Sequence, residues 1–467
     1  MFIKAITAAK KRTASDRPNV GADSAHLQEY VQKLQKMIGC QTVYREDGRN
    51  DAQYKKFYET IEQEFPLLHQ KGKKIPLEHC LLFQIEGKSD KNILIMSHHD
   101  VVEASENWKY PPFAAEIHDG KLFGRGTVDT KTPLFAEMQA VEELLGENVE
   151  FPCNVYIASS ANEETSGDGM LNALAYFKAN NIHFETVLDE GGAIVDGMVP
   201  TVKRRCAMIA VHEKGRHAYR CTATKDTSAD GGHSGLTGKS DNPLVRMCRF
   251  VCEAENIKYI RRFYPEVEAT FLETMPYMSY PLRCIFTSWK LFRRPMLKIL
   301  PKVNAQVGAM LGTTVSFNKI ETVDGKDHIQ SKQVQATAFF RCVREEDLQK
   351  DVETFKRVAA KYGITVELES TDYCRPADFQ CASFDYLRSV VNEIFPSVVV
   401  APYLLTAGTD ARRLSGVADN IYRFAPISLS KEQFATVHSD NENLDVASIG
   451  ECVNFYKKYI AGLTFSK

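Results

Sequence analysis

The stretch KNILIMSHHD, residues 91–100, places two adjacent histidines and an aspartate directly after an apolar run. The four consecutive apolar residues in it predict a short buried strand. His98, His99 and Asp100 would then lie where that strand runs out into a loop. Because open α/β sheets hold their ligands at the carboxyl ends of strands, the stretch predicts both a sheet and a candidate site.

The same pattern of an apolar run followed by acids occurs twice more along the chain. CNVYIASSANEE (residues 153–164) ends in two acidic residues, and HFETVLDEGG (residues 183–192) has two acidic residues followed by two glycines. A helical pattern, TPLFAEMQAVEELLGEN (residues 132–148), lies between the first strand and the second. Strands that alternate with helices predict an α/β core, which would bring the three strand ends to one edge of a sheet.

The organisation changes near AVHEKGRHAYRCTATKD, where the pattern becomes α+β until about residue 370. We therefore predict a discontinuous α/β domain made of residues 1–212 and 371–467, with an α+β domain inserted at 213–370. Residues 255–305 contain Trp289 and could form an amphipathic helix that touches a membrane. The favoured interpretation is an insertion that packs on its own domain, so no membrane contact is expected.

Composition limits the classes of partner. The 467 residues are 44% hydrophobic and 25% charged with a net charge of −2, which gives no electrostatic reason to expect nucleic acid. The twelve cysteines are scattered without any C-x-x-C pair, which favours buried thiols in a reducing compartment. Neither a signal peptide nor an uninterrupted run of about 18 apolar residues is found, so we expect a cytoplasmic protein.

Acidic and imidazole side chains at these loops form a candidate metal-ligand set. Asp129 lies in GRGTVDTK, Glu163 and Glu164 are adjacent in NEETSG, Glu190 lies in LDEGG, and His438 lies in VHSDNE. Carboxylates with two imidazoles suit zinc, manganese or cobalt, and a bridging carboxylate can hold two ions about 3.5 to 4 Å apart. An adjacent pair of acids at a strand end suits two tasks, metal binding and proton transfer.

Each of these elements also has an ordinary structural explanation. A histidine after a strand is often a loop hydrogen-bonding group, and paired acids often begin a helix. Asp129 could cap the helix that follows it, and LDEGG could be a turn. His438, beside acids, could belong to a surface ion-pair cluster. The joint placement at successive strand ends favours the metal site over these separate explanations.

Seven motifs together resemble the M20 metallopeptidases, which include carboxypeptidase S, aminoacylase-1 and N-acyl-amino-acid hydrolases. They are SHHDVV, GRGTVDTK, NEETSG, LDEGG, GGHSG, GTDAR and VHSDNE, in the order and at the spacing typical of the family. The resemblance covers most of the chain, and LDEGGAIVDGMVP followed by EKG is most similar to the carboxypeptidase S branch. It implies a zinc-peptidase catalytic domain and a lid or dimerisation domain.

The resemblance implies a ligand for each of two metal ions. His98 would bind one ion and His438 the other, with Asp129 bridging them. Glu164 would complete one site and Glu190 the other. The ions are expected to be Zn²⁺, with Co²⁺ or Mn²⁺ as alternatives.

The resemblance also assigns the residues around the ligands. His99 would be a spacer, and Asp100 would accept the ring N–H of His98 and so fix its tautomer. Glu163 would take a proton from the attacking water as a general base and pass it to the leaving nitrogen.

Substrate contacts are implied at three further positions. His233 in GGHSG would stabilise the oxyanion in the active site of the opposite subunit, which implies a homodimer; a turn histidine is the alternative. Arg412 would hold a substrate carboxylate, with Arg413 as a substitute, and Gly408 would let the backbone approach the ligand. One departure is DHIQ (residues 327–330), where many relatives carry Asn-Val-Ile-Pro, which leaves the contacts of that loop open.

The expected function is therefore the hydrolysis of an amide bond adjacent to a free carboxylate. The substrate would be a short peptide that loses its C-terminal residue, as in a carboxypeptidase or dipeptidase. Deacylation of an N-acyl amino acid is the alternative within enzymes. A non-catalytic metal-binding or peptide-binding relative is the alternative from another class, and the presence of Glu163 argues against it.

Overall fold

The computed structural model gives the arrangement of most of the chain. The described residues are 24–199, 201–225, 242–323 and 331–464. The predictions made for His233 and for the loop 327–330 lie outside them.

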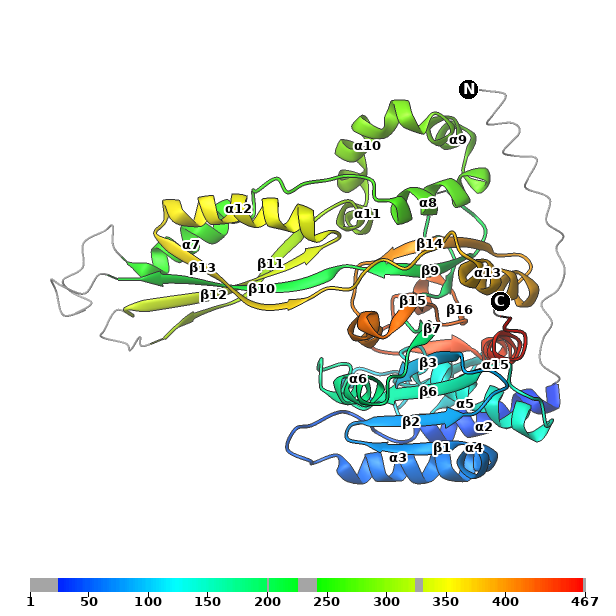
Figure 1. The fold of residues 1–467 in the computed structure, drawn as a ribbon. Coiled ribbons are helices and arrows are strands. Elements are labelled where there is room, and N and C mark those ends of the chain that lie inside the picture. The colour runs from blue at the N-terminus through cyan, green and yellow to red at the C-terminus, as the bar shows by residue number, and fades with distance from the viewer. Residues whose placement is uncertain (1–23, 200, 226–241, 324–330, 465–467) are drawn as a thin grey trace.

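A ten-stranded sheet forms the larger part of the molecule (Figure 1). Its order is β1, β2, β6, β3, β7, β15, β9, β8, β16, with β14 paired to β9. Its strands are β1 (Lys73–Leu77), β2 (Cys80–Ile85), β3 (Asn92–His98), β6 (Asn154–Ser160), β7 (Phe184–Asp189), β8 (Ile194–Val195), β9 (Cys206–Glu213), β14 (Val399–Leu405), β15 (Ala418–Arg423) and β16 (Ser428–Leu429). Strands β6, β3, β7 and β15 are parallel, so their carboxyl ends share one edge. This confirms the predicted α/β class and places the three predicted strand ends together.

Helices cover both faces of this sheet, which explains why the apolar run of β3 is uninterrupted. Ile93 and Ile95 belong to the core on one face, and Leu94 and Met96 belong to the core on the other. The first face is covered by α2 (Ser24–Ile38), α3 (Asp51–Glu64), α4 (Pro66–Lys71), α5 (Lys131–Gly146), α13 (Ala382–Ile394) and α15 (Val446–Ala461). The second face is covered by α6 (Gly169–Ala179) and the 3₁₀ segment η3 (Asp410–Gly416).

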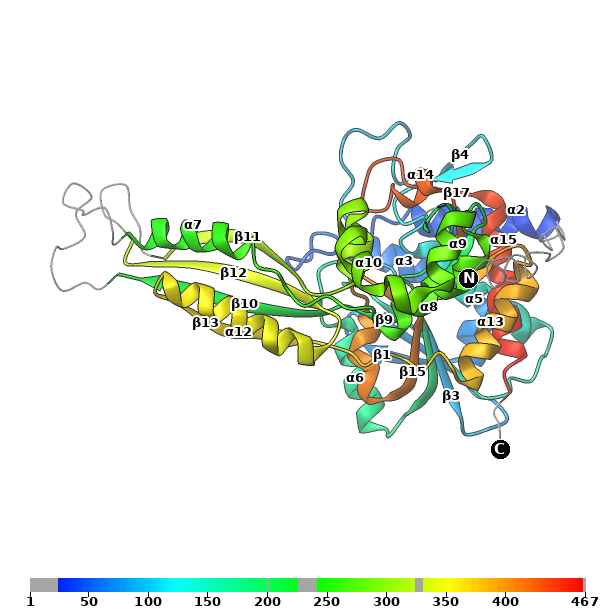
Figure 2. The same ribbon diagram turned by 90° about the horizontal axis from the view of Figure 1, so that it is seen from above.

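A separate four-stranded antiparallel sheet extends away from the larger one (Figures 1 and 2). Its order is β11 (Thr314–Thr322), β12 (Gln333–Cys342), β10 (Gly215–Thr224), β13 (Ile364–Asp372). Buried residues alternate along β12 because α7 (Pro243–Ala254) and α12 (Glu345–Lys361) cover one face only. A small sheet of β17 (Asn443–Asp445), β5 (Lys121–Phe123) and β4 (Glu116–His118) lies near α14 (Lys431–Phe434). The predicted domain boundaries at 212 and 370 stay predictions.

The helices between α7 and β11 pack on the larger sheet. They are α8 (Pro265–Thr274), the 3₁₀ segment η2 (Met275–Tyr277), α9 (Tyr280–Thr287), α10 (Trp289–Val303) and α11 (Ala305–Met310). Phe271 and Trp289 share a core with Met208 of β9 and Tyr403 of β14. The favoured interpretation, that this insertion packs on its own domain, is therefore wrong. These helices bury apolar side chains of β9 and β14 that the other helices leave uncovered.

Glu266 of α8 ties this group of helices to both sheets. Its carboxylate accepts hydrogen bonds of 2.8 and 2.9 Å from Arg344, and it lies 3.1 Å from Nδ1 of His212 at the end of β9. Burial alone would raise the pKa of Glu266, but the hydrogen bonds from His212 and Arg344 outweigh it and lower this pKa to about 2. The charged form of Glu266 is thus the form that stabilises the fold.

We expect Glu266→Gln to lower the free energy of unfolding at neutral pH by about 3 kcal/mol, because it leaves the partly buried Arg344 without its charged partner. A folded-state pKa below the ordinary 4.5 means that this stability is present above about pH 4.5 and is lost as the pH falls toward 2. Urea unfolding between pH 3 and about 6 should show a smaller pH dependence in the variant than in the wild-type chain. Equal pH dependence in the two chains would contradict this role.

Candidate metal centre

Five side chains predicted as ligands come from loops at one edge of the larger sheet. His98 is the last residue of β3, and Asp129 lies two residues before α5. Glu164 follows β6, Glu190 follows β7, and His438 lies in the loop after α14. The parallel strands place three of the loops side by side, and the chain's return through β15 and β16 brings the last one to them.

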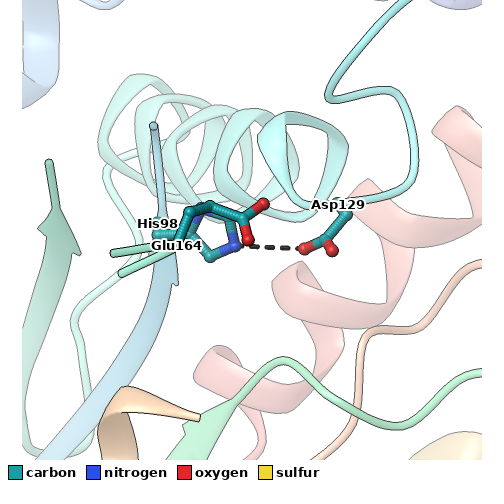
Figure 3. Close-up of side chains that lie close together, drawn as sticks. All are labelled: His98, Asp129 and Glu164. Carbon is teal, nitrogen blue, oxygen red and sulfur yellow. Dashed lines mark hydrogen bonds and ion pairs between the residues drawn. The ribbon is translucent and has the colours of Figure 1, made fainter. Parts of the chain in front are cut away.

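The carboxylate of Asp129 lies between the two imidazoles. Its Oδ1 is 3.0 Å from Nε2 of His98, as drawn in Figure 3, and its Oδ2 is 2.9 Å from Nε2 of His438. Nε2 of His98 is also 3.3 Å from Glu190, and Nε2 of His438 is 3.1 Å from Glu164. The result is two groups of one histidine and one glutamate that share Asp129.

The electrostatics of this cluster favour bound cations. Burial raises the pKa of Glu190 well above its usual range, and the charge of Asp129 adds to the rise although His98 opposes it. Hydrogen bonds that His438 donates to the two neighbouring carboxylates, Asp129 and Glu164, raise its pKa to about 10. Bound cations would stabilise so many acids around two imidazoles. The nitrogen and oxygen donors are those that zinc, cobalt and manganese accept, so these residues fit divalent ions.

Glu163 lies inside the same cluster. Its carboxylate, one ring nitrogen of His98 and a carboxylate oxygen of Glu190 all lie within 4.8 Å of one another. Burial raises the pKa of Glu163 well above its usual range, with further repulsion from Asp410, although His98 opposes the rise. The geometry therefore allows Glu163 either to bind an ion or to transfer a proton beside one.

Asp100 holds the loop that carries the two glutamates. Its carboxylate accepts the backbone N–H groups of Glu163 at 3.1 Å and Glu164 at 3.0 Å. The ring nitrogen Nδ1 of His98 is 2.9 Å from the backbone oxygen of Asp100 and 3.4 Å from its carboxylate. The backbone carbonyl, which can only accept, is thus the nearer partner that fixes the His98 tautomer. The prediction that the Asp100 side chain has this task stays a prediction.

His99 points into the core and away from the ligands. Its ring stacks on Phe57 at 5.0 Å and hydrogen-bonds Ser159 and Tyr58. Burial lowers its pKa well below the usual range, so the ring is neutral. In the pair of adjacent histidines, His98 therefore faces the cluster and His99 packs in the core, as alternation along a strand requires.

Glu442 was missed by the sequence analysis. It is fully buried and accepts hydrogen bonds from the backbone N–H groups of Val128 at 2.7 Å and Asp129 at 3.1 Å, and from Arg125. It lies four residues after His438, whose backbone φ of 57° is uncommon for residues other than glycine. Glu442 thereby joins the loops that carry Asp129 and His438. Its only signal in the sequence is its place in VHSDNE.

The predicted substrate arginine is already paired within the chain. Arg412 contacts the carboxylate of Asp372 through Nε and donates from Nη1 to the backbone oxygen of Thr409 at 2.8 Å. A Cβ at Gly408 would lie 2.8 Å from the Arg412 guanidinium and 3.5 Å from that of Arg341. The absent side chain at Gly408 thus leaves room for two guanidinium groups. The proposed contacts of Arg412 and Gly408 with a ligand stay predictions.

Arg341 is the second residue that sequence reasoning missed. Burial lowers its pKa, and the nearby charges of Arg216 and Arg412 lower it further. Arg341, Arg216 and Asp372 are paired across three adjacent strands of the four-stranded sheet. The partly buried guanidinium groups of Arg341, Arg216 and Arg412 favour an anionic ligand. The sequence shows only a single arginine near the end of a strand, which is a weak signal.

A buried ion pair supports the loop before η3. Glu213 accepts from Nε of Arg423 at 2.6 Å, and from the backbone and hydroxyl of Thr409 at 3.2 and 3.0 Å. Arg413, the predicted substitute for Arg412, instead donates to backbone oxygens at Ser166 and the following glycine. It therefore holds the loop after the two glutamates.

An α/β sheet with two histidines and several acids at the carboxyl edge defines a class, the metal-dependent hydrolases. The family model "Peptidase family M20/M25/M40" matches residues 94–462. The chain therefore belongs to this peptidase family, as the seven motifs predicted.

Individual relatives agree with this assignment. The chain is 28% identical over 443 residues to "Probable carboxypeptidase S-like 2" of Dictyostelium discoideum. The aligned residues cover 92% of this chain and 84% of that protein. It is 29% identical to the human "N-fatty-acyl-amino acid synthase/hydrolase PM20D1", over 81% of this chain and 76% of that one. A crystal structure of the M20 family metallo-carboxypeptidase Sso-CP2 from Sulfolobus solfataricus has the same fold, with a TM-score of 0.66, 19% identity and coverage of 93% and 98%.

Proposed function

We propose that this M20 peptidase holds two divalent ions and hydrolyses an amide bond adjacent to a free carboxylate. The observation that carries the proposal is the position of Asp129, whose two oxygens face one imidazole each at 3.0 and 2.9 Å. His98 and Glu190 would complete one site, and His438 and Glu164 the other. Zn²⁺ is the proposed ion, with Co²⁺ or Mn²⁺ as alternatives.

In the proposed reaction, Glu163 transfers the protons beside the bound ions. Bound ions would lower the pKa of a water and polarise the amide carbonyl. Glu163 takes a proton from that water while the oxygen of the water attacks the carbonyl carbon. Glu163 then gives the proton to the amide nitrogen as the C–N bond breaks. The products are a carboxylate and a free amine. A carboxyl whose pKa is raised by burial is suited to both halves of this transfer.

The substrate is proposed to be a short peptide that loses its C-terminal residue. The carboxypeptidase S-like relative supports this class, and the partly buried guanidinium groups of Arg341 and Arg412 would bind the free carboxylate. The N-fatty-acyl-amino acid hydrolase among the relatives supports the alternative, deacylation of an N-acyl amino acid. Both substrates carry the same carboxylate beside the bond that breaks.

The location of the protein in the cell and its oligomeric state stay predictions. A reducing, cytoplasmic location fits the twelve free cysteines, most of which are buried. A homodimer rests on the role assigned to His233, which lies outside the described residues. Among the described helices none is long and apolar enough to cross a membrane.

A panel of matched substrates tests this proposal. Dipeptides and N-acyl amino acids should be hydrolysed at least about 100-fold more efficiently, as kcat/KM, than the same compounds with the carboxylate converted to an amide. The reason is that the arginine group would lose its charged partner. Arg341→Gln and Arg412→Gln, measured in parallel, should each reduce this preference if both guanidiniums bind the carboxylate. Equal hydrolysis of acid and amide by the wild-type chain would contradict the proposal.

A further inference from the structure

Helix α10 lies at the outer surface of the molecule with one side packed (Figure 1). Trp289 and Met296 are buried in the core beneath it, and the Trp289 ring contacts Phe263 at 4.3 Å and Phe286 at 5.7 Å. The tryptophan that suggested membrane contact in the sequence thus faces inward. The opposite side of α10 carries no other described element in either view (Figures 1 and 2).

The exposed side of α10 carries two parallel rows of residues. The apolar row is Leu291, Pro295, Ile299 and Val303, and the basic row is Lys290, Arg294, Lys298 and Lys302. Residues four positions apart lie on successive turns of one helix face, and the two rows are neighbours because each of Arg294, Lys298 and Lys302 lies three positions after a member of the apolar row. Leu291, Ile299 and Val303 are 75%, 56% and 73% exposed, which is unusual for large apolar side chains.

The segment of chain that contains α10 carries charge of a single sign. Residues 274–320 contain no aspartate or glutamate, and their basic residues are Arg283, Lys290, Arg293, Arg294, Lys298, Lys302 and Lys319. Within the described part of the chain, no salt bridge involves a member of the basic row. Helix α12, also on the surface, differs from α10 in its charge and in its apolar residues. It mixes acids with bases, and it buries Leu348, Val352 and Phe355.

We propose that α10 docks on the surface of a bilayer that contains anionic lipid. Leu291, Ile299 and Val303 would enter the boundary between headgroups and acyl chains, while the basic row would meet the lipid phosphates and carboxylates. A fluid anionic surface matches a row of one charge beside an apolar row. A folded protein partner would instead need a shaped, mixed surface of polar and apolar groups. This inference reverses the expectation of no membrane contact, and it does not depend on the proposed function.

Flotation of the full chain with vesicles tests the inference. The chain should float with vesicles of phosphatidylcholine and phosphatidylserine, should not float with phosphatidylcholine alone, and should be released by high salt. Lys298→Gln should lower the partition coefficient about fivefold, because one basic residue near an anionic surface contributes about that factor. Leu291→Ser combined with Val303→Ser should abolish flotation.

A matched control comes from α6, which also exposes an apolar residue and a lysine. Leu171→Ser combined with Lys178→Gln should leave flotation unchanged, and thermal unfolding should be similar in all variants. Absence of flotation, equal flotation with neutral vesicles, or flotation that survives the α10 substitutions would overturn the inference. Concentration-dependent dimers that disappear in the α10 variants, without flotation, would assign this surface to a second copy of the chain instead.

Discussion

Glu163→Gln is expected to lower kcat by about 10³-fold while the metal content of the chain stays unchanged. Glutamine keeps the size and polarity of the side chain but cannot take a proton from water. KM should change little, because the proposed substrate contacts lie at other residues. Steady-state kinetics on a dipeptide or an N-acyl amino acid, beside elemental analysis of the same preparation, measures both quantities.

The adjacent residue supplies the control for this experiment. Glu164→Gln is the same chemical change one position along, but Glu164 lies 3.1 Å from Nε2 of His438 and is proposed to bind a metal. This variant should lose one ion together with its activity. If Glu163→Gln also loses an ion, Glu163 is a ligand, as its closeness to His98 and Glu190 would permit, and the general base is another group.

Asp129→Ala is expected to reduce the affinity for both ions and to bring turnover below detection. One carboxylate is proposed to serve both sites, so its removal takes a ligand from each and leaves two imidazoles with one acid apiece. Asp440→Asn is the control and should keep both metal and activity, because Asp440, two residues after His438, accepts a hydrogen bond from Ser105 and is not a proposed ligand. Metal titration and hydrolysis assays on the two variants provide the comparison. Retention of two tightly held ions by Asp129→Ala would rule out the bridging role.

Local patterns were sufficient to predict the elements that carry the candidate site. The uninterrupted apolar run of β3 and the acids after β6 and β7 depend on neighbouring residues alone, and each lies where it was expected. Their meeting at one edge follows from parallel pairing, which the alternation of strands and helices predicts. The motif order then identified the family, which the family model confirms.

Contacts between distant segments were not predictable in the same way. Glu442 accepts hydrogen bonds from a loop more than three hundred residues earlier, and nothing in its own neighbourhood marks it as buried. Arg341 meets Arg412 only because a strand of the second sheet reaches the loop before η3. The packing of α8 to α11 on the larger sheet depends on which apolar strand faces remain uncovered, and that is a property of the assembled fold.

The most direct test of the central claim is a metal titration of the chelator-treated chain, followed by calorimetry and by hydrolysis in the same samples. The account predicts that two Zn²⁺ ions bind per chain and that turnover appears only when both are present. It also predicts that Glu164→Gln and Glu190→Gln each retain one ion. A wild-type chain that reaches full activity with a single ion, or that binds none, would contradict the two-metal centre built on Asp129.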